Sequence, residues 1–184
     1  VSGEAGVDSV VLSGSVLGST VDLGSDADFF QANANLSSAL IAGNTGNDTF
    51  VFASAAVLTN TTVAGGSGQD SFLFVSALTT AFAFGGDGND SVVVQSSMLG
   101  GTISLDEGTD LVLFGGSVNT ASVYGGSGND SLFFSAGINA ATIDAGADAD
   151  SISVAGAVSR ATLLAGTGQD NLFIGGLNNA SLVS

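Results

Sequence analysis

An aspartate that recurs at a fixed interval constrains the fold of this chain more than any other feature. Nine such aspartates end short glycine-rich loops: Asp8, Asp28, Asp48, Asp70, Asp90, Asp110, Asp130, Asp150 and Asp170. Successive members are 20 residues apart, except that 22 residues separate Asp48 from Asp70, with the two extra residues expected around Val57 to Asn60. This period predicts one structural unit stacked nine times along an axis. We call these residues the ladder aspartates, and each repeat a coil.

Apolar residues alternate with other residues on both sides of each loop. The second and fourth residues after the aspartate are nearly all apolar, as in Phe72 and Phe74, which is typical of a strand with one buried face. A second strand precedes the loop, with an apolar residue seven positions before the aspartate, such as Ile103. A third apolar series lies eight residues after it, from Val16 to Val158. No segment shows helical periodicity.

These patterns predict an all-β protein, a parallel β-solenoid with nine coils of about 20 residues. We expect residues 1–184 to form a single domain, and the coil to be right-handed, because parallel crossovers almost always are. The repeat is already under way at Val1 and still running at Ser184. We therefore expect the chain to be a piece of a longer repeat protein.

Acidic residues far outnumber basic ones, and they are confined to one part of each repeat. The chain has 17 acidic residues and one basic residue, Arg160, for a net charge of −16. Every acid is a ladder aspartate or lies within the six residues before one. A solenoid would stack them along one edge, where partly exposed carboxylates about 5 Å apart repel by about 1–3 kcal/mol per pair. So acidic a surface argues against nucleic acid as a partner, and no apolar run approaches the roughly 18 residues of a transmembrane segment.

Repulsion of this size predicts a cation between the coils. Carboxylates and the main-chain carbonyls of glycine turns are hard oxygen ligands, which suit Ca²⁺. The alternative is that the aspartates only cap their turns, as Asp and Gly commonly do. That alternative leaves the acidic edge uncompensated.

The loops GGSGQD (65–70), GGDGND (85–90) and GGSGND (125–130) resemble the GGxGxDxUx repeat of RTX, or hemolysin-type calcium-binding, proteins. In that family the loop carbonyls and the aspartate bind Ca²⁺ between successive turns of a β-roll. The familiar roll has two such loops in 18 residues, whereas only one half of each coil carries the motif here, so we expect several Ca²⁺ ions along one edge. The resemblance assigns metal binding to Asp8, Asp28, Asp48, Gly65, Gly66, Gly68, Asp70, Gly85, Gly86, Asp87, Gly88, Asp90, Asp110, Gly125, Gly126, Gly128, Asp130, Asp148, Asp150, Gly166, Gly168 and Asp170.

Individual loops depart from this motif. Glu4 stands at the second glycine of the first loop, and Asp26 and Asp148 stand at the third glycine of theirs, where Asp tolerates positive φ better than most residues. The loop LDEGTD (105–110) lacks both leading glycines. Nine loops allow about eight sites between coils, and we expect weaker or altered sites in these loops.

The third residue after each ladder aspartate should point outward, yet most of these residues are apolar. We call this series the outer stripe: Val11, Gln31, Val51, Leu73, Val93, Leu113, Phe133, Ser153 and Phe173. Exposed apolar surface of this extent indicates packing against something else. Self-association through Leu73, Val93, Leu113, Phe133 and Phe173 is one interpretation, and coverage by a neighbouring domain of the same protein is the other.

Catalysis has no support, because the chain lacks His, Cys and Lys, and its serines have no base beside them. We expect instead a calcium-dependent structural or adhesive domain of a secreted bacterial protein at the cell surface, in a surface layer, fibre or adhesin. The resemblance implies type I secretion of an unfolded chain that folds outside on meeting Ca²⁺. The alternative is a folding and secretion module of a secreted enzyme or toxin. An ice- or carbohydrate-binding adhesin is a third reading, indicated only by an outward series from Thr20 to Thr162.

Overall fold

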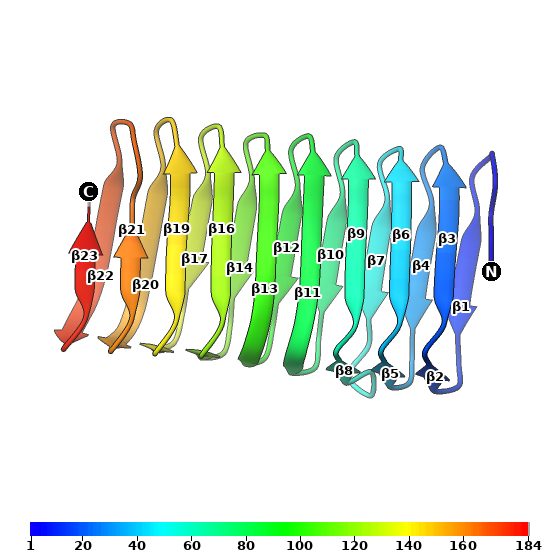
Figure 1. Cartoon of the computed structure of the whole chain (residues 1–184), viewed down its shortest axis with the longest axis horizontal. Coiled ribbons are helices and arrows are strands. Elements are labelled where there is room, and N and C mark those ends of the chain that lie inside the picture. The colour runs from blue at the N-terminus through cyan, green and yellow to red at the C-terminus, as the bar shows by residue number, and fades with distance from the viewer. Residues whose placement is uncertain (184) are drawn as a thin grey trace.

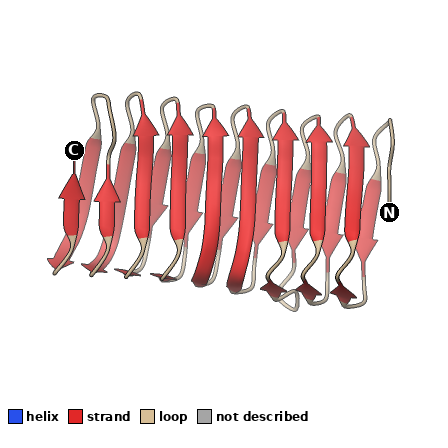
Figure 2. Ribbon diagram, viewed as in Figure 1, coloured by secondary structure: helices blue, strands red, loops and turns tan. Residues whose placement is uncertain are grey.

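The computed structural model describes residues 1–183, and within them it contains 23 strands and no helix (Figure 2). All strands pair in parallel and build a stack of flattened coils (Figure 1). In Figure 1 the front strands run upward, the back strands run downward, and the chain advances from right to left. The solenoid is therefore right-handed, and the predicted all-β parallel architecture is confirmed.

The strands that follow the ladder aspartates form the back face of Figure 1. Each begins one residue after its aspartate, and their bounds are β1 (Ser9–Leu12), β4 (Phe29–Ala32), β7 (Thr49–Phe52), β10 (Ser71–Phe74), β12 (Ser91–Val94), β14 (Leu111–Phe114), β17 (Ser131–Phe134), β20 (Ser151–Ser159) and β22 (Asn171–Asn178). None of these nine strands contains a charged residue.

The strands that lead into the loops form the front face. They are β3 (Thr20–Ser25), β6 (Leu40–Thr45), β9 (Thr62–Ser67), β11 (Leu78–Asp87), β13 (Met98–Glu107), β16 (Ser122–Ser127), β19 (Thr142–Ala147), β21 (Thr162–Leu164) and β23 (Ser181–Val183). Five two-residue strands lie at the second turn: β2 (Val16–Leu17), β5 (Leu36–Ser37), β8 (Leu58–Thr59), β15 (Val118–Asn119) and β18 (Ile138–Asn139). In the other coils the equivalent residues extend a longer strand.

Register follows the repeat, so like positions stack on like positions. Phe72 pairs with Phe50 on one side and Val92 on the other. The inward residues of both faces and of the third apolar series are buried from the second coil to the eighth. Phenylalanine rings stack between coils, with centroids 4.8 Å apart for Phe50–Phe72 and for Phe52–Phe74. The sequence periodicity therefore identified the core correctly.

The two extra residues of the third coil lie earlier than expected. Leu58 pairs with Leu36 and Leu78, so the coils are back in register by β8. The excess is taken up by a small turn closed by the hydrogen bond that Ala56 N–H donates to the carbonyl of Ala53. The placement around Val57 to Asn60 was therefore wrong, because a turn between two strands absorbs an insertion without breaking either ladder.

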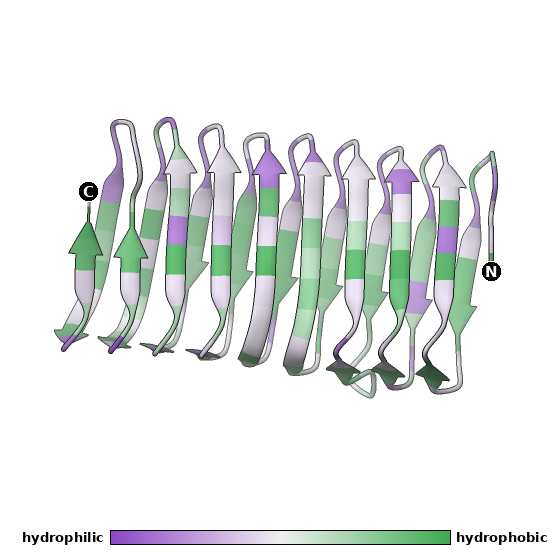
Figure 3. Ribbon diagram, in the orientation of Figure 1, coloured by the Kyte–Doolittle hydropathy of each residue, from purple (hydrophilic) through white to green (hydrophobic). Residues whose placement is uncertain are grey.

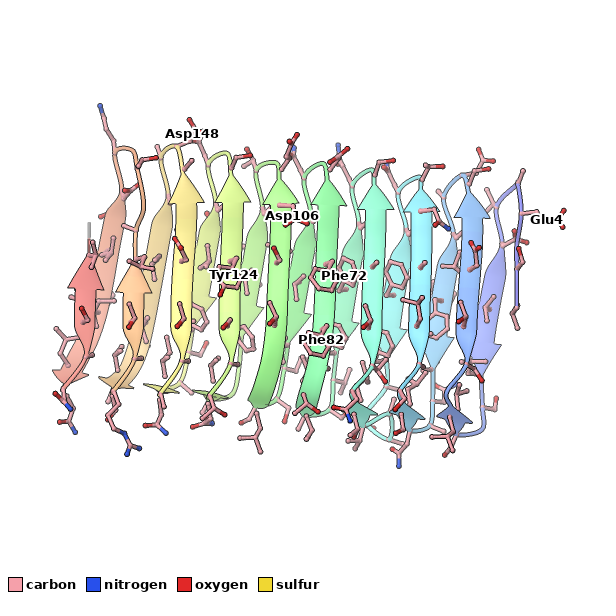
Figure 4. The ribbon with its side chains drawn as sticks, viewed as in Figure 1. Glu4, Phe72, Phe82, Asp106, Tyr124 and Asp148 are labelled. Carbon is pink, nitrogen blue, oxygen red and sulfur yellow. The ribbon has the colours of Figure 1, made fainter. Side chains whose placement is uncertain are left out.

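The residues predicted to point outward from the two-residue alternation of the strands do so. The outer stripe forms one continuous row on the back face, from Val11 paired with Gln31 to Ser153 paired with Phe173. Phe133 and Phe173 are exposed, and Leu73, Val93 and Leu113 are half-buried by their neighbours. On the front face, Phe82 and Tyr124 point outward (Figure 4). Nothing in residues 1–183 has the length and apolar character of a helical membrane span.

Candidate metal site

The loops repeat one backbone conformation in every coil. We number the six loop residues so that the ladder aspartate is position 6. Positions 2 and 4 have positive φ in all nine loops, a conformation that glycine adopts most easily. Five of these positions hold other residues, with φ values of 73° at Glu4, 85° at Asp26, 76° at Asn44, 67° at Asp106 and 82° at Asp148. The expectation that Asp26 and Asp148 replace glycine in this conformation is confirmed.

Glycine at positions 2 and 4 also lets the coils approach closely. The carbonyl oxygen of Gly66 is directed at the Cα of Gly86, and that of Gly68 at the Cα of Gly88, so that a Cβ on either later residue would overlap it. The same relation holds along the stack, including Gly126, Gly128, Gly166 and Gly168. The loop edge is therefore rich in main-chain oxygens that point along the solenoid axis.

Each ladder aspartate ties two coils together. Its Oδ1 accepts a hydrogen bond from the backbone N–H of the ladder aspartate in the preceding coil, as Asp70 does from Asp48 at 2.7 Å. All eight such bonds are present, at 2.6 to 3.1 Å. Oδ1 therefore accepts a backbone hydrogen bond, as expected if the aspartates cap their turns.

The side chains of the ladder aspartates lie inside the solenoid rather than on its surface. Asp28, Asp48, Asp70, Asp90, Asp110, Asp130 and Asp150 are only 1% to 3% exposed, and Asp8 and Asp170 in the terminal coils are half-buried. The assumption of partly exposed carboxylates was therefore wrong. It failed because hydrogen bonding to the preceding coil turns the side chain inward, where water no longer screens its charge.

The second carboxylate oxygen is buried and has no hydrogen-bond partner among residues 1–183. This holds for Oδ2 of all eight ladder aspartates from Asp8 to Asp150. A buried ionised carboxylate without compensation is costly enough that such groups normally acquire a partner or a proton. Eight aligned, buried oxygens without hydrogen-bond partners therefore favour a proton or a cation beside them.

Oδ2 also lies close to another acceptor. A Cβ on Gly65, at loop position 1, would overlap Oδ2 of Asp70 and would lie 2.8 Å from the carbonyl oxygen of Gly85 in the next coil. At Gly43, such a Cβ would overlap Oδ2 of Asp48 and lie 2.6 Å from the carbonyl oxygen of Gly65. Two oxygens that only accept hydrogen bonds therefore lie against the Cα of the same glycine, and a cation beside them would compensate both.

Burial shifts the titration of these carboxyls. It raises the pKa of Asp70 and of Asp110 to about 7 and that of Asp130 to about 6, against a partial lowering by the hydrogen bond to Oδ1. Neighbouring carboxylates raise these pKa values further. The same causes raise the pKa of Asp48, Asp90 and Asp150. At neutral pH the ladder therefore favours a bound positive charge over bare carboxylates.

The donors on this edge fit a hard cation. Within residues 1–183 no three acidic side chains converge as a metal-binding group, so an ion at Oδ2 would take most of its ligands from main-chain oxygens. Carboxylates with backbone carbonyls form the donor set of Ca²⁺ sites. The ladder aspartates and the loop glycines lie close to one another, whereas Asp87 and Asp148 are exposed, Asp148 at the loop edge (Figure 4).

Loop position 5 has a role that the sequence reasoning missed. Oδ1 of Asn47, Asn89 and Asn129 accepts the N–H of the equivalent residue in the next coil, at 2.8 to 2.9 Å. Hydrophilic residues accordingly recur where each loop enters its back strand (Figure 3). The recurrence of Asn before Asp was the available signal, and the stacking of coils explains it.

Comparison with known proteins does not identify a relative of this chain. No protein-family model, no curated protein and no solved structure matches the chain. The similarity to RTX repeats consequently depends on the loop residues and their 20-residue spacing.

Proposed function

We propose that this chain is a calcium-dependent structural or adhesive repeat domain of RTX type, located on the outside of a bacterial cell. The observation that carries the proposal is the row of eight buried Oδ2 atoms without partners. Ca²⁺ is the cation that suits a carboxylate surrounded by main-chain carbonyls. Titration of Ca²⁺ into chelator-treated protein, followed by circular dichroism, tests the proposal.

Calcium binding would be coupled to folding. The loop carbonyls and carboxylates come together only when adjacent coils stack, so an unfolded chain offers no such site. Without the ion, the buried carboxylates oppose stacking at neutral pH. This coupling supports export of an unfolded chain by type I secretion, followed by folding in a calcium-containing medium outside the cell.

The residues on the two faces favour a structural role over an ice- or carbohydrate-binding adhesin and over a secretion module. A regular threonine face for ice or carbohydrate is interrupted, because Leu40 and Phe82 occupy the same outward row as Thr20, Thr62 and Thr102. A secretion module attached to an enzyme would not need an apolar outer face. The back strands contain no charged residue and carry the mostly apolar outer stripe, although the chain has a charge of −16.

A second copy of this chain is the proposed occupant of the outer stripe. Nine coils about 4.8 Å apart give a face about 40 Å long, and four-residue strands make it about 13 Å wide, or about 500 Å². Stable complexes bury roughly 800 Å² per partner. Face-to-face pairing through the back strands would therefore be weak and dependent on concentration.

Replacing Leu73, Leu113 and Phe133 together by Ser should abolish this association and leave the coils intact. Each side chain points outward, so its loss removes apolar contact area between copies without opening the core. Sedimentation velocity in excess Ca²⁺ over a range of concentrations measures the effect. The control is the double substitution Phe82→Ser and Tyr124→Ser on the front face, which should associate like the parent chain. Unchanged association of the triple variant would exclude the outer stripe as the contact.

A further inference from the structure

We propose that the residue at loop position 1 determines which coils bind Ca²⁺, and that this chain has five sites rather than eight. The sites are those of Asp8, Asp48, Asp70, Asp90 and Asp130. Each of these loops has glycine at position 1: Gly3, Gly43, Gly65, Gly85 and Gly125. This inference rests on the proposed calcium-dependent function and assigns its ions to particular coils.

In these five loops, a carboxylate oxygen and a carbonyl oxygen of the next coil both lie against the Cα of the glycine at position 1. A Cβ on Gly85 would overlap Oδ2 of Asp90 and lie 3.0 Å from the carbonyl oxygen of Leu105. On Gly125 it would lie 2.5 Å from Oδ2 of Asp130 and overlap the carbonyl of Ala145. Gly3, Gly43 and Gly65 have the same pair of neighbours. The absence of a side chain at position 1 is what allows both oxygens to reach one cation.

Three other ladder aspartates have an unpaired Oδ2 but a side chain at position 1. Leu23 precedes Asp28, Leu105 precedes Asp110, and Ala145 precedes Asp150. Leu23, Leu105 and Ala145 have no exposed surface, so their side chains lie inside the solenoid, at the position that has no side chain in the five glycine loops. In the glycine loops an added Cβ would crowd both oxygens, so a side chain at position 1 should displace one of them, and its methyl or methylene group supplies no ligand.

The ninth loop lies outside both groups. Ala165 occupies position 1 before Asp170, and Oδ2 of Asp170 is not among the buried unpaired oxygens. Ala145 and Ala165 also show that the coil accepts alanine at this position. Substitutions between Gly and Ala at position 1 can therefore test the sites without removing the fold.

The test is a count of bound Ca²⁺ per chain in the 184-residue protein, by equilibrium dialysis and elemental analysis. We expect five ions in the parent chain, four in Gly65→Ala and six in Ala145→Gly. Gly14→Ala is the matched control, because a Cβ there meets nothing within 4 Å, and it should keep five ions. Circular dichroism in saturating Ca²⁺ verifies that each variant is folded.

The outcomes separate this inference from the function on which it rests. Eight ions in the parent chain, or an unchanged count in Ala145→Gly, would overturn the role of position 1 while leaving calcium binding in place. A folded parent chain that binds no Ca²⁺ would overturn both. Should Gly65→Ala fail to fold, Ala145→Gly still tests the role of position 1. It removes a side chain and should add one Ca²⁺ site.

Discussion

In a chelating buffer, the chain should be folded at about pH 5 and largely unfolded at about pH 8. Burial raises the pKa of Asp70 and Asp110 to about 7 and that of Asp130 to about 6, above the ordinary value of 3.8. The folded chain therefore binds more protons than the unfolded chain between these values. Stability from these groups is complete below the ordinary pKa and is lost as pH rises through about 6 to 7.

Far-UV circular dichroism across this range, with chelator in excess, measures the transition. The lower limit of pH 5 keeps the chain above its isoelectric point of about 4.1, where aggregation would obscure the signal. The control is the same series in excess Ca²⁺, in which the β spectrum should persist at pH 8. A chelated chain whose folded fraction rises with pH would contradict the burial of these carboxyls.

Two substitutions at Asp70 should differ in their effect on the chelated chain at about pH 6, where the parent chain is still folded. Asp70→Asn keeps an oxygen that accepts the N–H of Asp48 and places an N–H donor where the unpaired Oδ2 now lies. It also removes a carboxyl that must take up a proton to be buried, because burial raises its pKa to about 7, so it should raise the denaturation midpoint. Asp70→Ala removes the same carboxyl but also deletes the acceptor and leaves the Asp48 N–H without a partner, so it should be about 1–3 kcal/mol less stable than Asp70→Asn.

Urea denaturation with and without Ca²⁺ distinguishes these effects. Both variants should gain less stability from Ca²⁺ than the parent chain does, because each has lost a carboxylate ligand. The matched substitution is Glu107→Gln, which removes an exposed charge from the loop edge and should keep the parent chain's full response to Ca²⁺. If Asp70→Asn and the parent chain respond alike to Ca²⁺, the buried ladder is not the binding site.

The coils and the core could be predicted from the sequence because both depend on periodicity. Alternation with period two separates inward from outward residues, and a 20-residue repeat aligns them between coils. Phe72 and the outer-stripe residue Leu73 are adjacent in the chain and lie on opposite sides of one strand, as expected. These features need no knowledge of how a particular loop is folded.

The direction of the aspartate side chains could not be predicted in the same way. An Asp in a glycine-rich turn is usually solvated, and only the stacked structure shows that Oδ1 of Asp70 reaches the N–H of Asp48 and leaves Oδ2 buried. Likewise, Leu105 and Gly85 both occupy a buried position 1, so the alternation does not distinguish them, but only Gly85 leaves room for both oxygens. Contacts between coils determine this difference, and no single loop contains them.

The most direct test of calcium-dependent folding is a titration of Ca²⁺ into chelator-treated protein at about pH 8, followed by far-UV circular dichroism. We expect little β signal at first, then a cooperative gain as the ion binds the stacked loops. An equal concentration of Mg²⁺ should produce a much smaller gain, since it demands regular octahedral geometry and dehydrates reluctantly. A full β spectrum in excess chelator at this pH, unchanged by Ca²⁺, would contradict the account.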